Sequence, residues 1–180
     1  TVPVAERAPV AEALARALPR LHRAAPPDAP VNPARGTSLR ERRPFAERHL
    51  PAAREVLGET VVDRLLTLID AAEEVDPWPG VPVWCHGDLH DLNLALADDG
   101  TAGVLDLDDL TSGDPAVDLR VLWISFDEPT RAEAMATLEA SGAYDLGIWV
   151  RARGWAASSF VLPIVADRDS RPRFAAAIEF

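Results

Sequence analysis

The sequence contains no lysine, and all 18 of its basic residues are arginines. A mechanism that requires a lysine side chain therefore cannot be complete within this chain. Cysteine is nearly absent as well: Cys85 is the single cysteine, so no intrachain disulfide can form. Because no basic residue flanks Cys85 to activate its thiol, we interpret it as a small buried residue at the end of a strand rather than as a nucleophile.

Long apolar runs are absent too. Apolar residues make up 48% of the chain, but no run approaches the roughly 18 residues that a membrane-spanning helix needs. The first residues lack the basic and then apolar pattern of a signal peptide. The formal net charge of −11 disfavours a nucleic-acid partner and is compatible with a cationic small molecule. We expect a cytoplasmic protein with no membrane association, and 180 residues suffice for one domain.

Helical periodicity occupies both ends of the chain. Apolar residues there recur at three- and four-residue spacing, which is typical of helices with one buried face. Pro19 should kink or shorten the first helix, and Thr60 is a plausible cap for a helix that begins near it. The predicted helical segments are 9–23, 44–57, 59–74, 116–126, 130–140, 145–162 and 172–179.

The middle of the chain has a different pattern. Short apolar runs at 83–85, 93–97 and 102–107 predict strands, and the sequence Asp-Asp-Gly-Thr between the last two predicts a hairpin turn. We expect every strand to lie between residues 81 and 107. The predicted fold class is therefore α+β, mostly helical, with a small β-hairpin element in a single domain that spans residues 1–180.

Aspartates cluster at the ends of these strands. Asn93 follows Asp88 by five positions, and Asp106 follows Asn93 by 13, so a hairpin between Asn93 and Asp106 can return the chain to nearly the same place. Carboxylate and carboxamide oxygens suit Mg²⁺, which also binds substrate phosphates. Asp88 would then be available to accept a proton from an attacking hydroxyl. Phosphoryl transfer needs little more than such a base, a metal and a positioned donor.

Two motifs carry a resemblance to a known family. The sequence HGDLHDLN, residues 86–93, resembles the HGDxxxxN catalytic loop of the aminoglycoside phosphotransferase family, and its spacing is similar to that of the protein-kinase catalytic loop. The sequence GVLDLDDLTSGDPAVDL, residues 103–119, resembles the second signature of that family. The segments RARGWA, LHR and NPARGTSLRER are also similar to this family, so the resemblance covers nearly all of the chain.

The resemblance implies a role for each matching residue. Asp88 would be the catalytic base, and Asn93 and Asp106 would bind the Mg²⁺ that bridges ATP phosphates. His86 would brace the catalytic loop, and Asp118 would hydrogen-bond its backbone. The sequence departs from the family pattern at Leu107, where an aromatic residue is usual, and at Asp108, which is an added charge.

The resemblance also implies an N-terminal lobe to which no segment of this sequence is similar. Such kinases have an N-terminal lobe that holds the nucleotide with a lysine and a phosphate-covering loop. We therefore expect residues 1–180 to correspond to a protein-kinase-like C-lobe, which is the substrate-binding and catalytic-loop lobe. The missing N-lobe would be its partner, the nucleotide-binding residues stay unknown, and the chain alone should be inactive.

The implied activity is ATP-dependent phosphorylation of a hydroxyl on a small molecule, such as an aminoglycoside-like antibiotic or a metabolite. One alternative is a non-catalytic binding or scaffold protein that retains a kinase C-lobe. A second is a metal-dependent phosphoesterase, which would want more convergent histidine and aspartate ligands than this sequence offers.

Several polar residues have more ordinary interpretations. His90 could face the phosphate or cap its loop, and Asp109 could order its loop or contact substrate. His22 and His49 are interpreted as surface or packing residues, because no ligand spacing accompanies them. The arginines of residues 40–43 are interpreted as a solvated run, and Asp114 as a helix N-cap.

Overall fold

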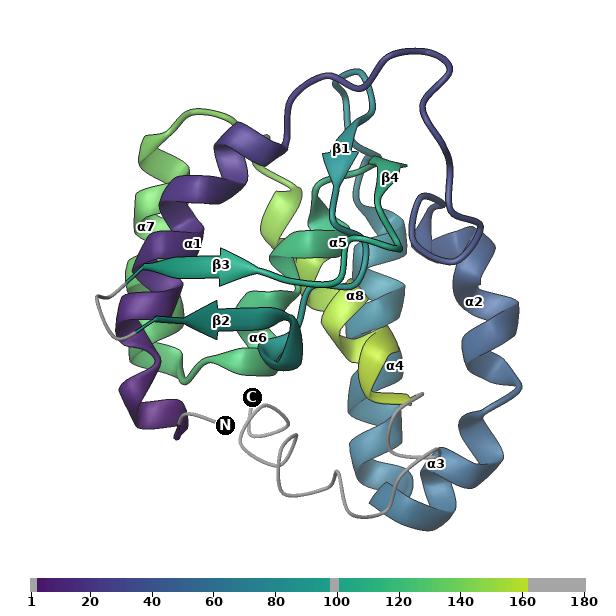
Figure 1. The fold of residues 1–180 in the computed structure, drawn as a ribbon. Helices are drawn as coiled ribbons and strands as arrows, with labels where there is room; N and C mark the ends of the chain where they lie inside the picture. Colours follow the sequence, from purple (N-terminus) through teal and green to yellow (C-terminus); the bar gives the residue numbers. More distant parts are fainter. Residues whose placement is uncertain (1–2, 98–100, 162–180) are drawn as a thin grey trace.

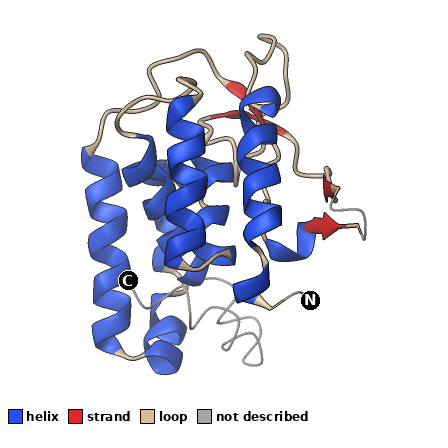
Figure 2. Ribbon diagram, turned by 90° about the vertical axis from the view of Figure 1, so that its left-hand side faces the viewer, coloured by secondary structure: helices blue, strands red, loops and turns tan. Residues whose placement is uncertain are grey.

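The computed structural model describes residues 3–97 and 101–161 and shows a mostly helical molecule with short strands on one side (Figures 1 and 2). This arrangement confirms the predicted α+β class. The elements in chain order are η1 (Val4–Glu6), α1 (Ala8–Leu21), α2 (Leu39–Glu47), α3 (Leu50–Leu57), α4 (Glu59–Glu74), β1 (Val83–Cys85), η2 (Asp91–Asn93), β2 (Leu94–Leu96), β3 (Ala102–Val104), β4 (Thr111–Gly113), α5 (Ala116–Leu119), α6 (Val121–Ser125), α7 (Glu128–Ala140) and α8 (Ile148–Val161).

Helices α4 and α8 form the centre of the molecule (Figure 1). Helix α4 buries Val62, Leu65 and Ile69 on one face, which is the three- and four-residue spacing that predicted it. Helix α8 approaches so closely that a Cβ placed on Gly154 would lie 2.3 Å from the Cβ of Ala72. Glycine at this position therefore lets the two helices pack at short range.

Helix α1 packs against α7 on the other side of the molecule (Figure 1). Its buried face consists of Val10, Ala11, Leu14, Ala15 and Leu18. Pro19 lies inside this helix, which nevertheless continues to Leu21. Because proline has no N–H, the helix lacks the hydrogen bond that residue 19 would otherwise donate to the carbonyl of Ala15.

The strands form two separate two-stranded antiparallel sheets. Strands β2 and β3 pair with Leu94 opposite Val104, which is the hairpin expected from the sequence. Strand β1 pairs with β4, whose residues Thr111–Gly113 lie outside the range to which we had confined the strands. That expectation was wrong because β4 is short and polar, and it is a strand only through its long-range pairing with β1.

Several helix boundaries and one predicted cap differ from the structure. The predicted helix 44–57 is divided between α2 and α3. Helix α2 also begins earlier than predicted, after a capping box in which the side chains of Ser38 and Glu41 each bond the backbone N–H of the other residue. The segment 116–126 is divided into α5 and α6 at Arg120. Thr60 is not a cap: Gly58 holds the N-cap position of α4 without a side-chain bond.

The C-terminal helices differ in part from the prediction. Helix α8 begins at Ile148, three residues later than predicted. The predicted helix 172–179 lies outside the described residues. Among the described helices, none is both long enough and apolar enough to cross a bilayer.

Candidate active site

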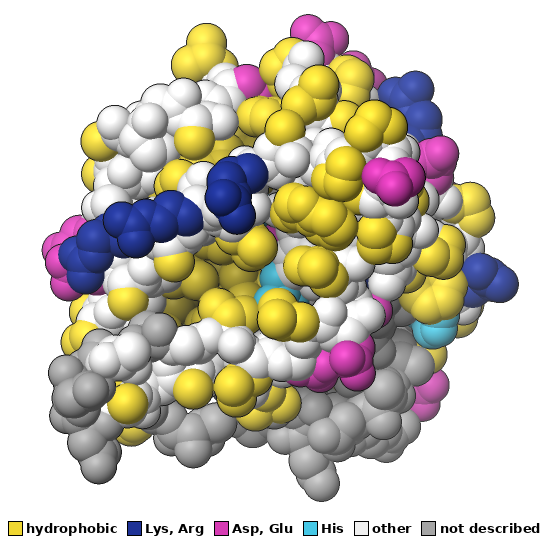
Figure 3. All heavy atoms as spheres, turned by 45° about the horizontal axis from the view of Figure 1, so that its top comes forward, with side chains coloured by type: hydrophobic (Ala, Val, Ile, Leu, Met, Phe, Trp, Pro, Cys, Tyr) yellow, Lys and Arg dark blue, Asp and Glu magenta, His cyan; other side chains and the backbone are white. Residues whose placement is uncertain are grey.

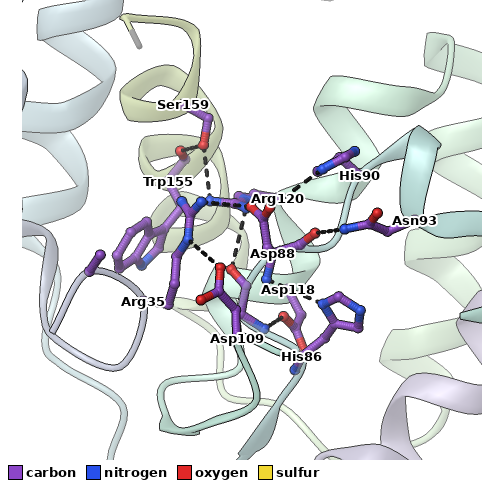
Figure 4. Close-up of polar contacts among 12 residues, drawn as sticks. Arg35, His86, Asp88, His90, Asn93, Asp109, Asp118, Arg120, Trp155 and Ser159 are labelled. Carbon is purple, nitrogen blue, oxygen red and sulfur yellow. Dashed lines mark hydrogen bonds and ion pairs between the residues drawn. The ribbon is translucent and has the colours of Figure 1, made fainter. Parts of the chain in front are cut away.

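The loop after β1 carries the HGD motif, and its shape depends on a glycine. Gly87 has φ +85°, and a Cβ there would lie 2.4 Å from the carbonyl oxygen of Asp109. Any other residue would therefore be strained and would push Asp109 away. Within this turn, the backbone N–H of Asp88 donates to Nδ1 of His86 at 3.3 Å (Figure 4).

The side chain of Asp118 holds this loop in place through hydrogen bonds to its backbone. Its Oδ2 accepts a hydrogen bond from the backbone N–H of His86 at 2.7 Å, and its Oδ1 accepts one from the N–H of Gly87 at 2.8 Å. Asp118 is fully buried, so bonded donors must compensate for its lost hydration. Burial opposes ionisation, but His22 and these two amides outweigh it and lower the pKa of Asp118.

His22 is the third partner of Asp118, and sequence reasoning missed this role. Its Nε2 lies 3.1 Å from Oδ2 of Asp118, and its Nδ1 lies 2.9 Å from the hydroxyl of Tyr144. His22 is thus a packing residue and not a surface one. It connects the end of α1 to the loop support, and nothing in its local sequence indicates a partner 96 positions away.

Stability at low pH should depend on Asp118. Its pKa in the folded chain lies below the ordinary aspartate value of about 3.9, so its contribution is complete above about pH 4 and is lost as the pH falls further. We expect the free energy of unfolding to decline below about pH 4, and to decline less steeply in an Asp118→Asn variant. Guanidinium unfolding at pH 3 to 7 measures this, and parallel curves for the two proteins would contradict it.

His86 and Asn93 together fix the end of the hairpin. The ring Nε2 of His86 lies 2.8 Å from the carbonyl oxygen of Leu105, and the N–H of Leu105 donates to the carbonyl of Asn93 at 2.9 Å. The next residue, Asp106, has φ +59°, the one positive value among the described non-glycine residues. Aspartate tolerates this conformation better than most residues do. Such a constrained backbone is typical of functional positions.

The same contacts join the backbone segments that carry the three predicted site residues. The side-chain Nδ2 of Asn93 donates to the carbonyl oxygen of Asp88 at 2.9 Å, and the backbone of Asn93 is bonded to the residue before Asp106. Because the amide nitrogen of Asn93 is used in this way, its Oδ1 is the end that can accept a cation. The donor set of one carboxamide oxygen and one carboxylate fits Mg²⁺.

The Asp88 carboxylate is surrounded by positive groups that the sequence did not reveal (Figure 4). Its Oδ1 lies 2.7 Å from Nη2 of Arg35 and 2.9 Å from Nη2 of Arg120, and its Oδ2 lies 3.5 Å from Nε2 of His90. Partial burial would raise its pKa, but His90 and then the two arginines prevail, and the pKa of Asp88 lies well below its usual range. The carboxylate is therefore ionised and oriented.

His90 and Asp109 each have a visible structural contact. The Nδ1 of His90 accepts the N–H of Leu92 at 3.2 Å and so caps η2, while its other nitrogen approaches Asp88. Oδ1 of Asp109 accepts a hydrogen bond from the side chain of Asn32 at 2.8 Å, which ties the proline-rich loop to the site. Both residues thus order loops that meet at Asp88.

Two further expectations have a clear outcome. Asp114 accepts the N–H of Ala116 at 2.9 Å at the start of α5 and also binds Arg151 at 2.7 Å. The interpretation of residues 40–43 as solvated was wrong for Arg42, which is buried and lies 5.6 Å from the ring centroid of Trp155. Its hydrophobic stem and planar head pack on aromatic rings, which a run of arginines does not predict.

Three buried residues have side chains of the types that bind metals, but their hydrogen bonds and protonation do not suit a metal site. The ligand atoms of His22, Cys85 and Asp118 lie within 4.8 Å of one another. However, both nitrogens of His22 are engaged with Tyr144 and Asp118. Burial raises the pKa of the Cys85 thiol, whereas a metal ligand must be a thiolate. We conclude that this group is a hydrogen-bonded part of the core.

Comparison with protein families agrees with the resemblance that the two sequence motifs carry. A model of the phosphotransferase enzyme family, APH, matches residues 2–155. Because this match covers most of the chain, the chain belongs to that family. No curated protein is significantly similar to it in sequence.

Two solved structures have a similar fold. One is a macrolide 2′-phosphotransferase type I, with 24% identity and a TM-score of 0.59 over 98% of this chain. Another is macrolide 2′-phosphotransferase MphH from Brachybacterium faecium, as the apoenzyme, with 21% identity and a TM-score of 0.54 over 99% of this chain. The chain spans only 60% and 63% of the lengths of these two proteins. At these identities the likeness shows a shared fold.

Proposed function

We propose that this chain is the catalytic-loop lobe of an ATP-dependent phosphotransferase that acts on a hydroxyl of a small molecule. The observation that carries the proposal is that Asn93 bonds both the backbone of Asp88 and the end of the hairpin that leads into Asp106. Family membership supports the reaction type. The two similar structures are named as macrolide phosphotransferases, which makes hydroxyl-bearing antibiotics the first substrates to test.

Asp88 would orient the acceptor hydroxyl. Its Oδ1 is occupied by two arginines, so Oδ2, with only His90 at 3.5 Å, is the oxygen that can accept the hydroxyl hydrogen bond. A carboxylate with a lowered pKa is a weak base, and it would take the proton only as the new bond to phosphorus forms. This suits phosphoryl transfer, in which positioning contributes more than early proton removal.

Asn93 and Asp106 would hold the metal. Bound Mg²⁺ neutralises charge on the nucleotide phosphates and orients them. The chain's own contribution is to fix the two ligands: Asn93 through its bond to Asp88, and Asp106 through the backbone bonds of Leu105. The side chain of Asn93 and the backbone of Asp106 would therefore be held in place before any cation binds.

Exposed apolar residues adjoin the site. Val104, Leu105 and Leu107 are 36%, 51% and 55% exposed and flank Asp106. Figure 3 shows many hydrophobic side chains, and a hollow lined by them, on the upper front face of the molecule. We propose that a nucleotide-binding lobe covers the surface beside Asp106, because such apolar exposure is typical of a surface that contacts another domain or a ligand.

The metal role of Asp106 predicts a specific defect. An Asp106→Asn variant keeps a residue that tolerates positive φ but loses one anionic ligand, so the Kd for Mg-nucleotide should rise about tenfold or more, with lower turnover. The midpoint of activation by Mg²⁺ should rise with it. Asp108→Asn, two residues away and exposed, should leave both values unchanged. Calorimetry and a Mg²⁺ titration of activity measure these quantities.

The proposal as a whole is tested by turnover. The intact enzyme, which includes the proposed nucleotide-binding lobe, is assayed with Mg-ATP and a panel of aminoglycosides, macrolides, sugars and amino alcohols in a coupled assay for ADP. ADP release that depends on one acceptor supports the proposal. Binding of an acceptor without ADP release would instead favour the scaffold alternative, and phosphate release without an acceptor would favour the phosphoesterase.

A further inference from the structure

Two arginines contact one oxygen of Asp88, and only one of them is explained by burial. The side chain of Arg120 is 2% exposed and also donates to Oγ of Ser159 at 3.1 Å. A buried guanidinium needs a carboxylate partner, so the burial of Arg120 is sufficient to explain its ion pair with Asp88. Arg35 is 20% exposed and would remain partly hydrated without Asp88. Its position at the site therefore needs another reason.

The loop that carries Arg35 is firmly attached. The backbone N–H of Asn32 donates to Oγ1 of Thr111 at 2.9 Å, and the N–H of Gly36 donates to the carbonyl of Asn32 at 2.7 Å. The N–H of Ser112 donates to the carbonyl of Pro30 at 2.8 Å. Two of these bonds fix the loop to β4 at Pro30 and Asn32, and the third closes a turn that contains Arg35, so the side chain reaches Asp88 from a preorganised backbone.

The positive groups around Asp88 repel one another. Burial, and then the charge of Arg35, lower the pKa of both Arg42 and Arg120 to about 10. Arg35 itself faces Asp88 at 2.7 Å and Asp109 at 3.8 Å. Crowded guanidinium groups are costly unless an anion lies among them. Asp88 and Asp109 offset part of this cost, and an anionic ligand that contacts Arg35 would offset more of it.

We propose that Arg35 is a catalytic residue that binds the phosphoryl group during its transfer, an inference that rests on the proposed function. The acceptor oxygen forms a bond to the terminal phosphorus of ATP. The bond from phosphorus to the bridging oxygen breaks, ADP leaves with the electron pair, and the hydroxyl proton passes to Asp88. Negative charge lies on the phosphoryl oxygens next to the oriented hydroxyl, within reach of Arg35.

The chemistry of arginine fits this position. Its planar guanidinium binds two phosphate oxygens in parallel, which a point charge cannot do. The 180 residues include no lysine, so arginine is the only permanently positive side chain that they can supply there. Because Arg120 still pairs with Asp88, Arg35 can turn to the phosphoryl group without leaving Asp88 unpaired.

Turnover of the active enzyme gives the first test. Arg35→Gln should lower kcat about 10²–10³-fold with little change in the KM for the acceptor, since the contact is made to the transferring group. Arg35→Lys should recover part of the loss. Arg40→Gln removes an arginine that donates to the carbonyl of Glu73 and should have no effect. Equal kcat for wild type and Arg35→Gln would overturn the inference, as would a loss that Arg35→Lys does not reduce and that accompanies a lower Tm.

Anion binding by the 180-residue chain gives a second test that does not need turnover. Inorganic tripolyphosphate is titrated calorimetrically into wild type, Arg35→Gln and Arg40→Gln. We expect Arg35→Gln alone to weaken binding about tenfold or more. Unchanged binding in Arg35→Gln would overturn the inference. If binding depends on Arg35 but the active enzyme phosphorylates no hydroxyl, the proposed function fails while the anion site stands.

Discussion

Replacing Asp88 with asparagine should lower turnover about 10²–10⁴-fold, the range for loss of a positioned base, and leave the Kd for Mg-nucleotide within about twofold. Asparagine has the shape of aspartate and an oxygen for Arg120, so the loop should keep its form. It cannot accept the hydroxyl proton. Because the base acts on the transition state, kcat should fall much more than nucleotide affinity does.

The control for this prediction is Asp108→Asn. Asp108 is an exposed aspartate on the same segment as Asp106, so the variant makes the same change in net charge away from the acceptor oxygen. It should be as active as the wild type. The assay is single-turnover kinetics beside calorimetry with Mg-ATP. Small and equal losses from Asp88→Asn and Asp106→Asn would mean that both residues are structural.

Replacing Asp118 with alanine should cost about 3–5 kcal/mol of stability, because it leaves buried donors without an acceptor. The abandoned groups are the N–H groups of His86 and Gly87 and the ring of His22. Asp118 is fully buried, so water cannot replace the lost carboxylate. The catalytic loop should also lose its shape, and its amides should exchange faster with solvent.

The control for stability is Asp63→Ala. Asp63 pairs with Arg54 at 2.9 Å, but its side chain is 62% exposed, so the loss should be no more than about 1 kcal/mol. Urea unfolding followed by circular dichroism measures both variants, and hydrogen exchange follows the amides of residues 86 and 87. If Asp118→Ala proved as stable as Asp63→Ala, the loop would be held by other contacts.

The sequence predicted the parts of the site that are close along the chain. Asp88, Asn93 and Asp106 lie on one loop and one hairpin, and a hairpin of known length brings its ends together wherever the rest of the chain lies. Helix α4 was predicted with its observed boundaries, because its apolar face repeats through four turns. Local geometry and periodicity are sufficient for features of this kind.

The tertiary structure alone decided the charges around Asp88 and the support behind the loop. Of the partners of Asp88, Arg35 lies on a proline-rich loop and Arg120 at the junction of α5 and α6. His22, the partner of Asp118, lies at the end of α1. Strand β4 likewise exists through pairing with β1. A single arginine or histidine has no periodicity or spacing to read, and its partner depends on how distant helices pack. The sequence by itself thus determined the order and type of the proposed site residues. Packing determined which cations contact Asp88, since an ion pair forms only where the fold places both charges within a few ångströms.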